Sequence, residues 1–241
     1  MDTNIGAKER VTQNRLIGLF KNVLKYTYLG NWETREDNAN IEEKLLTAYL
    51  SRRGYTDKEI RSSIVKLKQS ANSLGGGLYN ANKEVYTFLR YGVNIQAEVT
   101  EKKKMVHLID WANPMENDFQ IAEEVTIQGA SDRRPDLVVY VNGIALAVIE
   151  LKRSTVSAHE GIRQNIRNQQ DGYIPRFFTT IQLLFAGNDT EGLHYGVIKT
   201  PEKISGCVGK NRVASHASHR ILQQRSIPMS WIVVCCSSLS L

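Results

Sequence analysis

Two apolar runs on either side of Asn142-Gly143 constrain the fold of this chain more than any other feature of its sequence. The runs, at residues 137–141 and 146–151, are rich in β-branched side chains, and an Asn-Gly pair between such runs predicts a β-hairpin. Polar residues interrupt the runs only at Asp136, Glu150 and Lys152. Burial of carboxylates costs free energy unless a partner compensates their charge. We therefore expect a charged site at the open end of the hairpin.

Two carboxylates at such a strand end suit a divalent cation. Mg²⁺ prefers oxygen ligands and keeps several waters, so two carboxylates and a main-chain carbonyl suffice to hold it. Lys152 follows Glu150 by two residues, lies on the same face of the strand, and would stabilise charge on a phosphoryl oxygen. The alternative is a Glu–Lys ion pair at a sheet edge. Glu-x-Lys also occurs at 42–44 and 101–103, outside apolar strands, so the spacing alone leaves both interpretations open.

The register of the hairpin decides whether the two carboxylates share one face. A strict two-residue turn pairs Asp136 with Ile149 and places Asp136 and Glu150 on opposite sides of the sheet. A three-residue loop at 141–143, with Gly143 left-handed in a bulge, pairs Asp136 with Val148 and brings the charged groups together. We predict the three-residue loop.

The first 75 residues have helical periodicity. One stripe joins Leu16, Phe20 and Val23, and extends back through Gln13 to Glu9. A second helix is indicated around 41–49, and a third runs to residue 71 from a capping box at Thr56 and Glu59. Three glycines at 75–77 interrupt this pattern, and residues 81–85 are expected to form a short helical turn.

Beyond residue 85 the hydrophobic period changes to two. Strands are predicted at 93–99, 105–111, 119–128, 137–141, 146–151, 181–186 and 195–198, a hairpin tip at 100–104, and a helix at about 157–171. This order favours an α/β (α+β) fold, a mixed β-sheet flanked by helices with an N-terminal helical part. The helical part is expected at about 7–75 and the sheet core at about 85–203.

Composition separates residues 204–241 from the rest of the chain. The 241 residues have a formal net charge of +6, but this segment supplies four of the six charges and contains no Asp or Glu. It also holds all three cysteines. Its possible zinc ligands are Cys207, His216, His219, Cys235 and Cys236, and the adjacent pair rarely binds one metal. We expect a disordered or out-of-frame tail rather than a zinc site.

Several classes of protein are excluded or disfavoured by the same inspection. No run of 18 apolar residues predicts a membrane span, and the N-terminus lacks the apolar core of a secretory signal. Residues 1–203 contain no cysteine, which favours an intracellular, cytoplasmic protein without disulfides. Serine, cysteine and histidine form no credible nucleophilic triad. The body carries a net charge of only +2, so bulk charge is weak evidence for nucleic-acid binding.

Several stretches of the sequence resemble one known family. Arg134-Pro135-Asp136 followed by Glu150-Leu151-Lys152 resembles the PD-(D/E)xK nuclease signature. Over about residues 5–203 the chain resembles the N-terminal endonuclease region of the restriction (R, motor) subunit of type I restriction-modification enzymes. The matching stretches are ERVTQNR at 9–15, LYNANK at 78–83, NGIALAVIELK at 142–152 and QQDGY at 169–173, the last of which fits the family's Q-x-x-x-Y motif.

The resemblance implies a restriction-endonuclease-like domain that cuts double-stranded DNA with Mg²⁺. In that case Asp136 and Glu150 would bind the metal together with the main-chain carbonyl of Leu151. Lys152 would assist catalysis.

Three further residues are implicated by the resemblance. Gln169 and Tyr173, four residues apart at a helix end, would order the site or touch DNA, and Glu9 would reach it from the first helix with Gln13. The alternatives are helix termination with a packed tyrosine for the first two, and for Glu9 an acid favoured by the helix dipole.

Arginines near these motifs are candidates for DNA-backbone contacts. They are Arg134, Arg153, Arg163 and Arg167, of which the last two lie four residues apart on one predicted helix. The alternative is a scatter of ordinary surface arginines. His159 is isolated in this region and is expected to be a surface residue.

The resemblance ends near Lys203, before any motor. Residues 206–210 lack the spacing of a Walker A loop, so ATP binding would belong to missing translocase domains. We expect a truncated or frameshifted R subunit whose partners are double-stranded DNA and the modification and specificity subunits. The competing hypotheses are a catalytically silent DNA-binding remnant and a stand-alone PD-(D/E)xK hydrolase.

Overall fold

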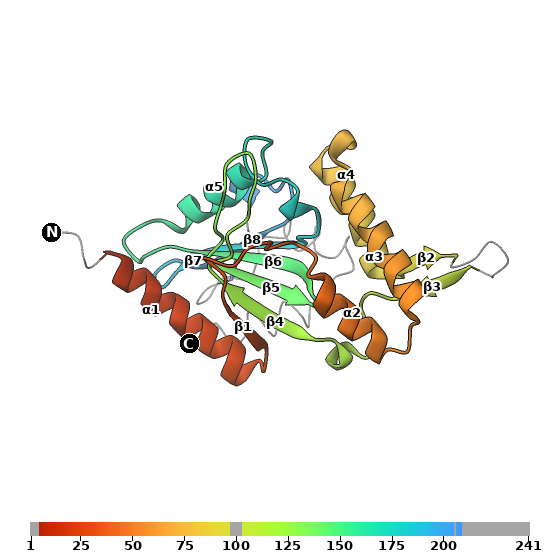
Figure 1. Ribbon diagram of the computed structural model, residues 1–241. Helices are drawn as coiled ribbons and strands as arrows, with labels where there is room; N and C mark the ends of the chain where they lie inside the picture. Colours follow the sequence, from red (N-terminus) through yellow and green to blue (C-terminus); the bar gives the residue numbers. More distant parts are fainter. Residues whose placement is uncertain (1–4, 97–102, 205, 209–241) are drawn as a thin grey trace.

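The computed structural model describes residues 5–96, 103–204 and 206–208, and is built around one mixed β-sheet (Figure 1). The seven strands of this sheet lie in the order β1-β4-β5-β6-β7-β8-β9. Their bounds are β1 Thr27–Asn31, β4 Phe119–Glu123, β5 Leu137–Val141, β6 Ile144–Leu151, β7 Leu183–Asn188, β8 Gly192–Gly196 and β9 Gly206–Val208. The β1–β4 and β6–β7 pairs are parallel and the other neighbours are antiparallel. The expected fold class, a mixed sheet flanked by helices, is confirmed.

Helices α1 (Ile5–Gly18) and α5 (Ala158–Asn168) lie on opposite faces of this sheet (Figure 1). Leu16 and Phe20 of the α1 region pack on the face formed by Leu137, Ile149 and Phe185. The helix continues as a π-helical turn, Leu19–Val23. On the other face, α5 packs on β7 and β6. The parallel β6–β7 pair needs a crossover connection, and α5 provides it.

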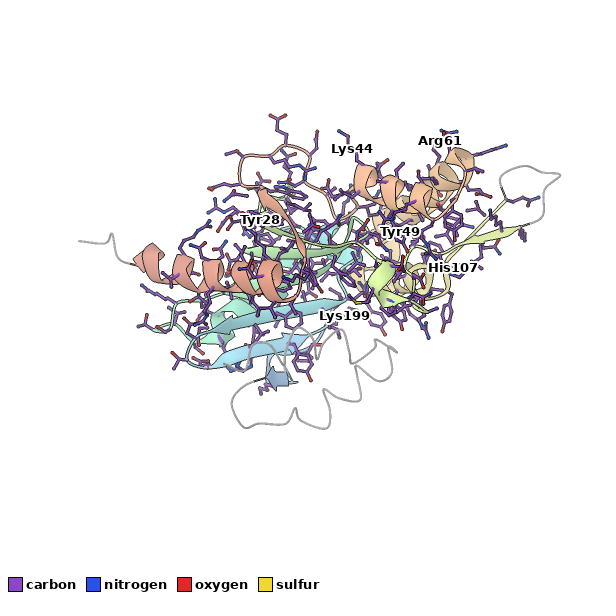
Figure 2. All side chains as sticks on the ribbon, turned by 90° about the horizontal axis from the view of Figure 1, so that it is seen from below. Tyr28, Lys44, Tyr49, Arg61, His107 and Lys199 are labelled. Carbon is purple, nitrogen blue, oxygen red and sulfur yellow. The ribbon has the colours of Figure 1, made fainter. Side chains whose placement is uncertain are left out.

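A second hydrophobic core lies beside the sheet. It is formed by α2 (Glu43–Arg52), α3 (Asp57–Asn72) and α4 (Leu78–Tyr91) with the two-stranded sheet of β2 (Val93–Ile95) and β3 (Lys104–Val106). Tyr49, Leu67, Val85 and Leu108 are fully buried in it. The side chain of Tyr49, labelled in Figure 2, extends from α2 into this core.

The predicted elements agree with the structure in type but differ in extent. The capping box of α3 is present, with Thr56 accepting from the Glu59 N–H and Glu59 bonding back to the Thr56 N–H. Residues 81–85, expected as a short turn, lie within the 14-residue helix α4, because the glycines before it provide a start rather than an end. The strand expected at 119–128 ends at Glu123, because Glu124 has a positive φ of 52° and turns the chain.

Two features of the sheet were not predicted. The strand β1 lies inside the part expected to be helical, yet pairs with β4 in the main sheet. Conversely, β2 and β3 were expected in a continuous meander but form a sheet of their own. Their contacts with α3 explain this, since the helical core already buries Val93 and Val106.

The predicted three-residue hairpin loop is wrong, but the face assignment is right. Asn142 and Gly143 have φ values of 55° and 80° in a two-residue turn that pairs Val141 with Ile144. The extra residue lies instead inside β6, where a bulge shifts the register between Val139 and Tyr140. Leu137 therefore pairs with Ile149, and one further step places Asp136 opposite Glu150.

The start of β6 explains where this bulge forms. Ala145 N–H donates to the carbonyl of Asn40 across 2.9 Å, and the carbonyl of Gly143 accepts from the Glu42 N–H across 2.8 Å. The segment before α2 therefore hydrogen-bonds to the first residues of β6, which also pair with β5. A Cβ at Gly143 would lie 2.8 Å from the Glu42 carbonyl oxygen, so both the positive φ and this close approach require glycine.

Some expectations fall outside the described residues. The tip at 100–104 is described from Lys103 onward, where β3 begins at Lys104. Of the tail at 204–241, the structure describes Ile204 and β9, which pairs with β8, and the zinc candidates from His216 onward lie outside the described residues. Among the described residues, no helix combines the length and apolar composition that a membrane span requires.

Candidate active site

Asp136 and Glu150 meet at the open end of the β5–β6 hairpin. The Leu151 N–H donates to Asp136 Oδ2 across 2.6 Å, which fixes the Asp136 carboxylate against β6. Glu150 is fully buried, and its Oε2 accepts from Gln164 Nε2 of α5 across 2.8 Å. The other oxygen, Glu150 Oε1, has no hydrogen-bond partner among the described residues. The bulge therefore brings together two carboxylates, one of them with an unpartnered buried oxygen.

The electrostatics of this pair follow from burial. Burial raises the pKa of Asp136 to about 6, although the Leu151 N–H and Lys152 act in the opposite direction. Burial also raises the pKa of Glu150 well above its usual value, and the nearby Asp136 carboxylate raises it further. Two adjacent carboxyls that both resist ionisation favour retention of a proton between them when no cation is near. Strongly shifted carboxyls beside a cation-bearing residue are typical of functional sites.

Lys152 and Glu9 complete the group. Lys152 Nζ lies 4.0 Å from Glu9 Oε1 of α1, and the two side chains are 17% and 34% exposed. The Lys152 ammonium favours the ionised form of both Asp136 and Glu150, so it lies close to the two carboxyl groups. Four of the predicted site residues, Asp136, Glu150, Lys152 and Glu9, are brought together from three separate elements.

Helix α1 reaches this end of the sheet through a row of polar residues. Gln13 Nε2 donates to Glu123 Oε2 and to Glu124 Oε1, each across 3.0 Å, and Arg10 Nη1 forms an ion pair with Glu123 of 2.8 Å. The Tyr28 hydroxyl of β1, which Figure 2 shows beside α1, also donates to Glu123. Burial and this hydrogen bond raise the pKa of Tyr28 to about 12. The polar stripe of α1 therefore anchors the helix to the end of β4.

Gln169 and Tyr173 are not joined to the carboxylates by any contact among the described residues. Gln169 Nε2 donates to the Asn165 carbonyl, and Gln169 Oε1 accepts from the Lys199 N–H. The Tyr173 ring stacks on the Arg133 guanidinium, 4.2 Å from its centroid. The glutamine that does reach Glu150 is Gln164, which the motif spacing did not select.

Sequence reasoning also missed Glu123 and Glu124. Glu123 ends β4 and Glu124 follows it, just as Asp136 and Glu150 lie at the ends of the apolar runs of the hairpin. This placement at a strand end was the sequence signal that could have identified both residues.

The four candidate arginines lie in different settings. Arg134 forms ion pairs with Glu33 and with Glu124, the latter at 2.9 Å. Arg163 is held by Glu160 and Glu202 on the outer face of α5. Arg153 is partly exposed and Arg167 is exposed. His159, expected at the surface, is partly exposed and its Nδ1 lies 3.1 Å from Glu202 Oε1.

The donor set at the hairpin end fits a hard divalent cation. The described residues contain no group of three His, Cys, Asp or Glu side chains arranged to hold a metal by themselves. Two carboxyl groups are present, however, and Glu150 Oε1 is a buried carboxyl oxygen without a hydrogen-bond partner among the described residues. Mg²⁺ is bound by one or two carboxylates and completes its shell with water and substrate oxygens. Asp136 and Glu150 therefore match the requirements of Mg²⁺ better than those of a fully protein-ligated metal.

Comparison with known proteins identifies the family of this chain. Residues 6–203 match the family model described as type I restriction enzyme R protein N terminus. A protein of Methanocaldococcus jannaschii provisionally named as the MjaIXP endonuclease subunit of a type I restriction enzyme is 26% identical over 201 residues, which are 76% of this chain and 19% of the relative. The type I restriction enzyme SsaAORF53P endonuclease subunit of Staphylococcus saprophyticus is 30% identical over 88 residues, 36% of this chain and 9% of its own.

The match covers residues 6–203 of this chain but only a small part of the relatives. The chain spans about a fifth or less of the length of these curated relatives. The matched region contains every strand from β1 to β8 and the site residues from Glu9 to Tyr173. On this evidence, the chain belongs to the family of type I restriction enzyme R protein N termini.

Proposed function

We propose that this chain is a Mg²⁺-dependent endonuclease domain that hydrolyses phosphodiester bonds of double-stranded DNA. The observation that supports this most directly is the pairing of Asp136 with the fully buried Glu150, whose Oε1 is unpartnered, near the ammonium of Lys152. The names of the relatives, which are type I restriction enzyme endonuclease subunits, support the same conclusion.

In this proposal Asp136, Glu150 and the main-chain carbonyl of Leu151 hold the cation. A bound Mg²⁺ supplies Lewis-acid polarisation of a phosphoryl oxygen and helps to position an attacking water. Gln164 orients Glu150 through its 2.8 Å hydrogen bond, so that Glu150 Oε1 is left for the cation. Lys152 stabilises the negative charge that develops on the phosphate.

The outer residues have supporting roles. Glu9 holds the Lys152 ammonium near the pair across 4.0 Å. Gln169 and Tyr173 order the end of α5 and the segment that follows it, where Tyr173 stacks on Arg133. Arg134, Arg153, Arg163 and Arg167 are proposed contacts to the DNA backbone, and binding by them would weaken steeply with salt.

The wider assembly is also part of the proposal. We place the domain in the cytoplasm as one end of a type I restriction R subunit, with modification and specificity subunits as partners. ATP use would belong to translocase regions outside this chain, in agreement with the share of the relatives that it spans.

Metal-dependent cleavage of plasmid DNA tests the proposal. The full chain is incubated with plasmid and Mg²⁺, alongside Asp136→Ala and Lys152→Ala. Each substitution should lower the cleavage rate at least about a hundredfold, since each removes a metal ligand or a stabilising charge. Lys44→Ala is a matched control, because Lys44 belongs to the Glu-x-Lys triplet at 42–44 and is exposed on α2.

The alternatives give different outcomes. A silent DNA-binding remnant would retard DNA in a gel but would neither bind Mn²⁺ nor cut DNA. The unsubstituted chain and its three variants would then behave alike. A stand-alone hydrolase would cut at full rate without modification and specificity subunits, whereas a restriction subunit would be stimulated by them.

A further inference from the structure

Glu124 is an acidic residue beside the candidate site that the nuclease signature does not include. It directly follows β4, and its main-chain N–H donates to the carbonyl of Asp136 across 2.9 Å. Gln13 Nε2 lies 3.0 Å from Glu124 Oε1 and 3.5 Å from the Asp136 carbonyl oxygen, so the Glu124 carboxylate lies beside Asp136. Glu124 therefore lies close enough to the pair to influence any cation bound there.

The backbone of Glu124 is in an unusual conformation. Its φ of 52° lies in the left-handed region, which residues with a side chain seldom occupy. Such a conformation persists where the surroundings determine it strongly, and it is concentrated at functional sites. Here the hydrogen bonds of Glu124 and Val125 to the Asp136 and Pro135 carbonyls hold the turn.

The carboxylate of Glu124 is fixed by three side chains. Gln13 Nε2 donates to Oε1 across 3.0 Å, Arg134 Nε lies 2.9 Å from Oε2, and Arg10 Nη1 lies 3.7 Å from Oε1. The side chain is only 16% exposed. Because the Glu124 carboxylate is already fixed, little side-chain entropy is lost when a cation binds nearby.

The preceding residue, Glu123, provides a natural contrast. It is also held by Gln13 and Arg10, and it is 3% exposed. Glu123 is the last residue of β4, however, where it pairs with Leu137, and its carboxylate also accepts from the Tyr28 hydroxyl. Glu124 instead bonds through its N–H to the Asp136 carbonyl, so the main chain of Glu123 lies one register step farther from the Asp136–Glu150 pair.

We infer that Glu124 is an outer carboxylate of the cation site, fixed beside Asp136 so that it strengthens the binding of a divalent cation by Asp136 and Glu150. This inference rests on the proposed function. An independent observation, the unpartnered and fully buried Glu150 Oε1, indicates where the cation binds. Glu124 acts through its charge and is a positioning residue, not a catalytic one.

Calorimetric titration of the full chain with Mn²⁺, without DNA, tests this inference. Glu124→Gln should weaken binding roughly tenfold, because it removes one negative charge from the surroundings of the site. Glu123→Gln, the matched control, should change the dissociation constant less than about twofold. Urea unfolding without metal confirms that both variants fold.

Arg134→Gln separates a charge effect from loss of structure. If Glu124 acts through its charge, removal of Arg134 should strengthen Mn²⁺ binding several-fold, opposite in sign to Glu124→Gln. Weaker binding in both variants, or unchanged binding in Glu124→Gln, would overturn the inference and leave the proposed function standing. Absence of Mn²⁺ binding by the unsubstituted chain would overturn both.

Discussion

The β5–β6 hairpin has a buried polar group at each end, and the two ends differ in how those groups are satisfied. At the turn, Asn142 is fully buried, and its Nδ2 donates to the Leu108 carbonyl and to Asn117 Oδ1. Its Oδ1 accepts from the Asp118 N–H. At the open end, Glu150 is equally buried, but Oε1 has no partner among the described residues.

The difference shows that burial alone does not distinguish a structural polar group from a functional one. A buried polar group with all of its hydrogen bonds rigidifies a core, whereas an unpartnered charged group destabilises it. The turn end therefore contributes stability, whereas the open end reduces the stability of the metal-free chain and leaves free the oxygen to which the proposed cation would bind. Changes at the two ends should have opposite effects on the free energy of unfolding.

The largest effect is expected at the turn. Asn142→Ala removes three buried hydrogen bonds and leaves the Leu108 carbonyl and the Asp118 N–H without this partner. The free energy of unfolding should fall by about 4 kcal/mol, as measured by urea denaturation. Asn72→Ala, at the exposed end of α3, is the control and should change it by less than about 0.5 kcal/mol. A similar small change for Asn142→Ala would contradict the comparison.

The next effect is a pH dependence at the open end. Because the pKa of Asp136 rises from 3.8 to about 6 on folding, the folded state holds this proton more tightly than the unfolded state. The stabilising contribution of this proton to the free energy of unfolding is fully present below pH 3.8 and is lost as pH rises to about 6. The loss should be about 2 kcal/mol, after allowance for the partial exposure of Asp136.

Unfolding measured from pH 4 to pH 7 in EDTA checks this sign. The stability of the unsubstituted chain minus that of Asp136→Asn should fall across this range and be flat above it. A difference that rises with pH would show that the carboxylate is stabilised, not destabilised, by folding.

A smaller gain is expected from Glu150→Gln. The substitution keeps an oxygen to accept from Gln164 and removes a buried charge, so the metal-free chain at pH 8 should be more stable by about 1–2 kcal/mol. Thermal unfolding with EDTA measures it, with exposed Glu116→Gln as the control. The same variant should lose Mn²⁺ binding. Reduced stability would mean that the Glu150 charge is compensated in the fold.

The smallest effect concerns the packing of α5 over the site. A Cβ at Gly161 would lie 3.0 Å from the Ala186 Cβ and 3.5 Å from the Glu150 Cβ. Gly161→Ala should therefore displace α5 slightly, and the steric cost should exceed the gain in helix propensity by about 1 kcal/mol. Cleavage should fall several-fold as Gln164 moves from Glu150. Gly172→Ala, which meets no atom within 4 Å, is the control; equal effects would exclude this contact as the cause.

Much of the fold was predictable, because local patterns specify it. The bounds of β5 agree with the prediction, and the capping box of α3 is where the sequence indicates. β1 was not predicted, because Thr27–Asn31 is short and its pairing partner β4 lies almost a hundred residues later. Pairing with such a distant strand leaves no local signal.

The site was predictable in part. The residues Asp136, Glu150 and Lys152 stand out as polar positions beside apolar strands. Gln164 does not, because it is one of several amides in a polar helix, and only the crossover of α5 over β6 brings it to Glu150. The Q-x-x-x-Y spacing selected Gln169 instead, whose contacts are to Asn165 and Lys199.

The amino-acid sequence by itself determined the hairpin, its charged open end and the family to which the chain belongs. These depend on residue type and spacing along the chain. The tertiary structure decided the register, because the bulge in β6 accompanies bonds to Asn40 and Glu42 from another part of the chain. One extra residue in a strand reverses every side chain beyond it. That reversal, set by distant contacts, places Asp136 and Glu150 on the same face.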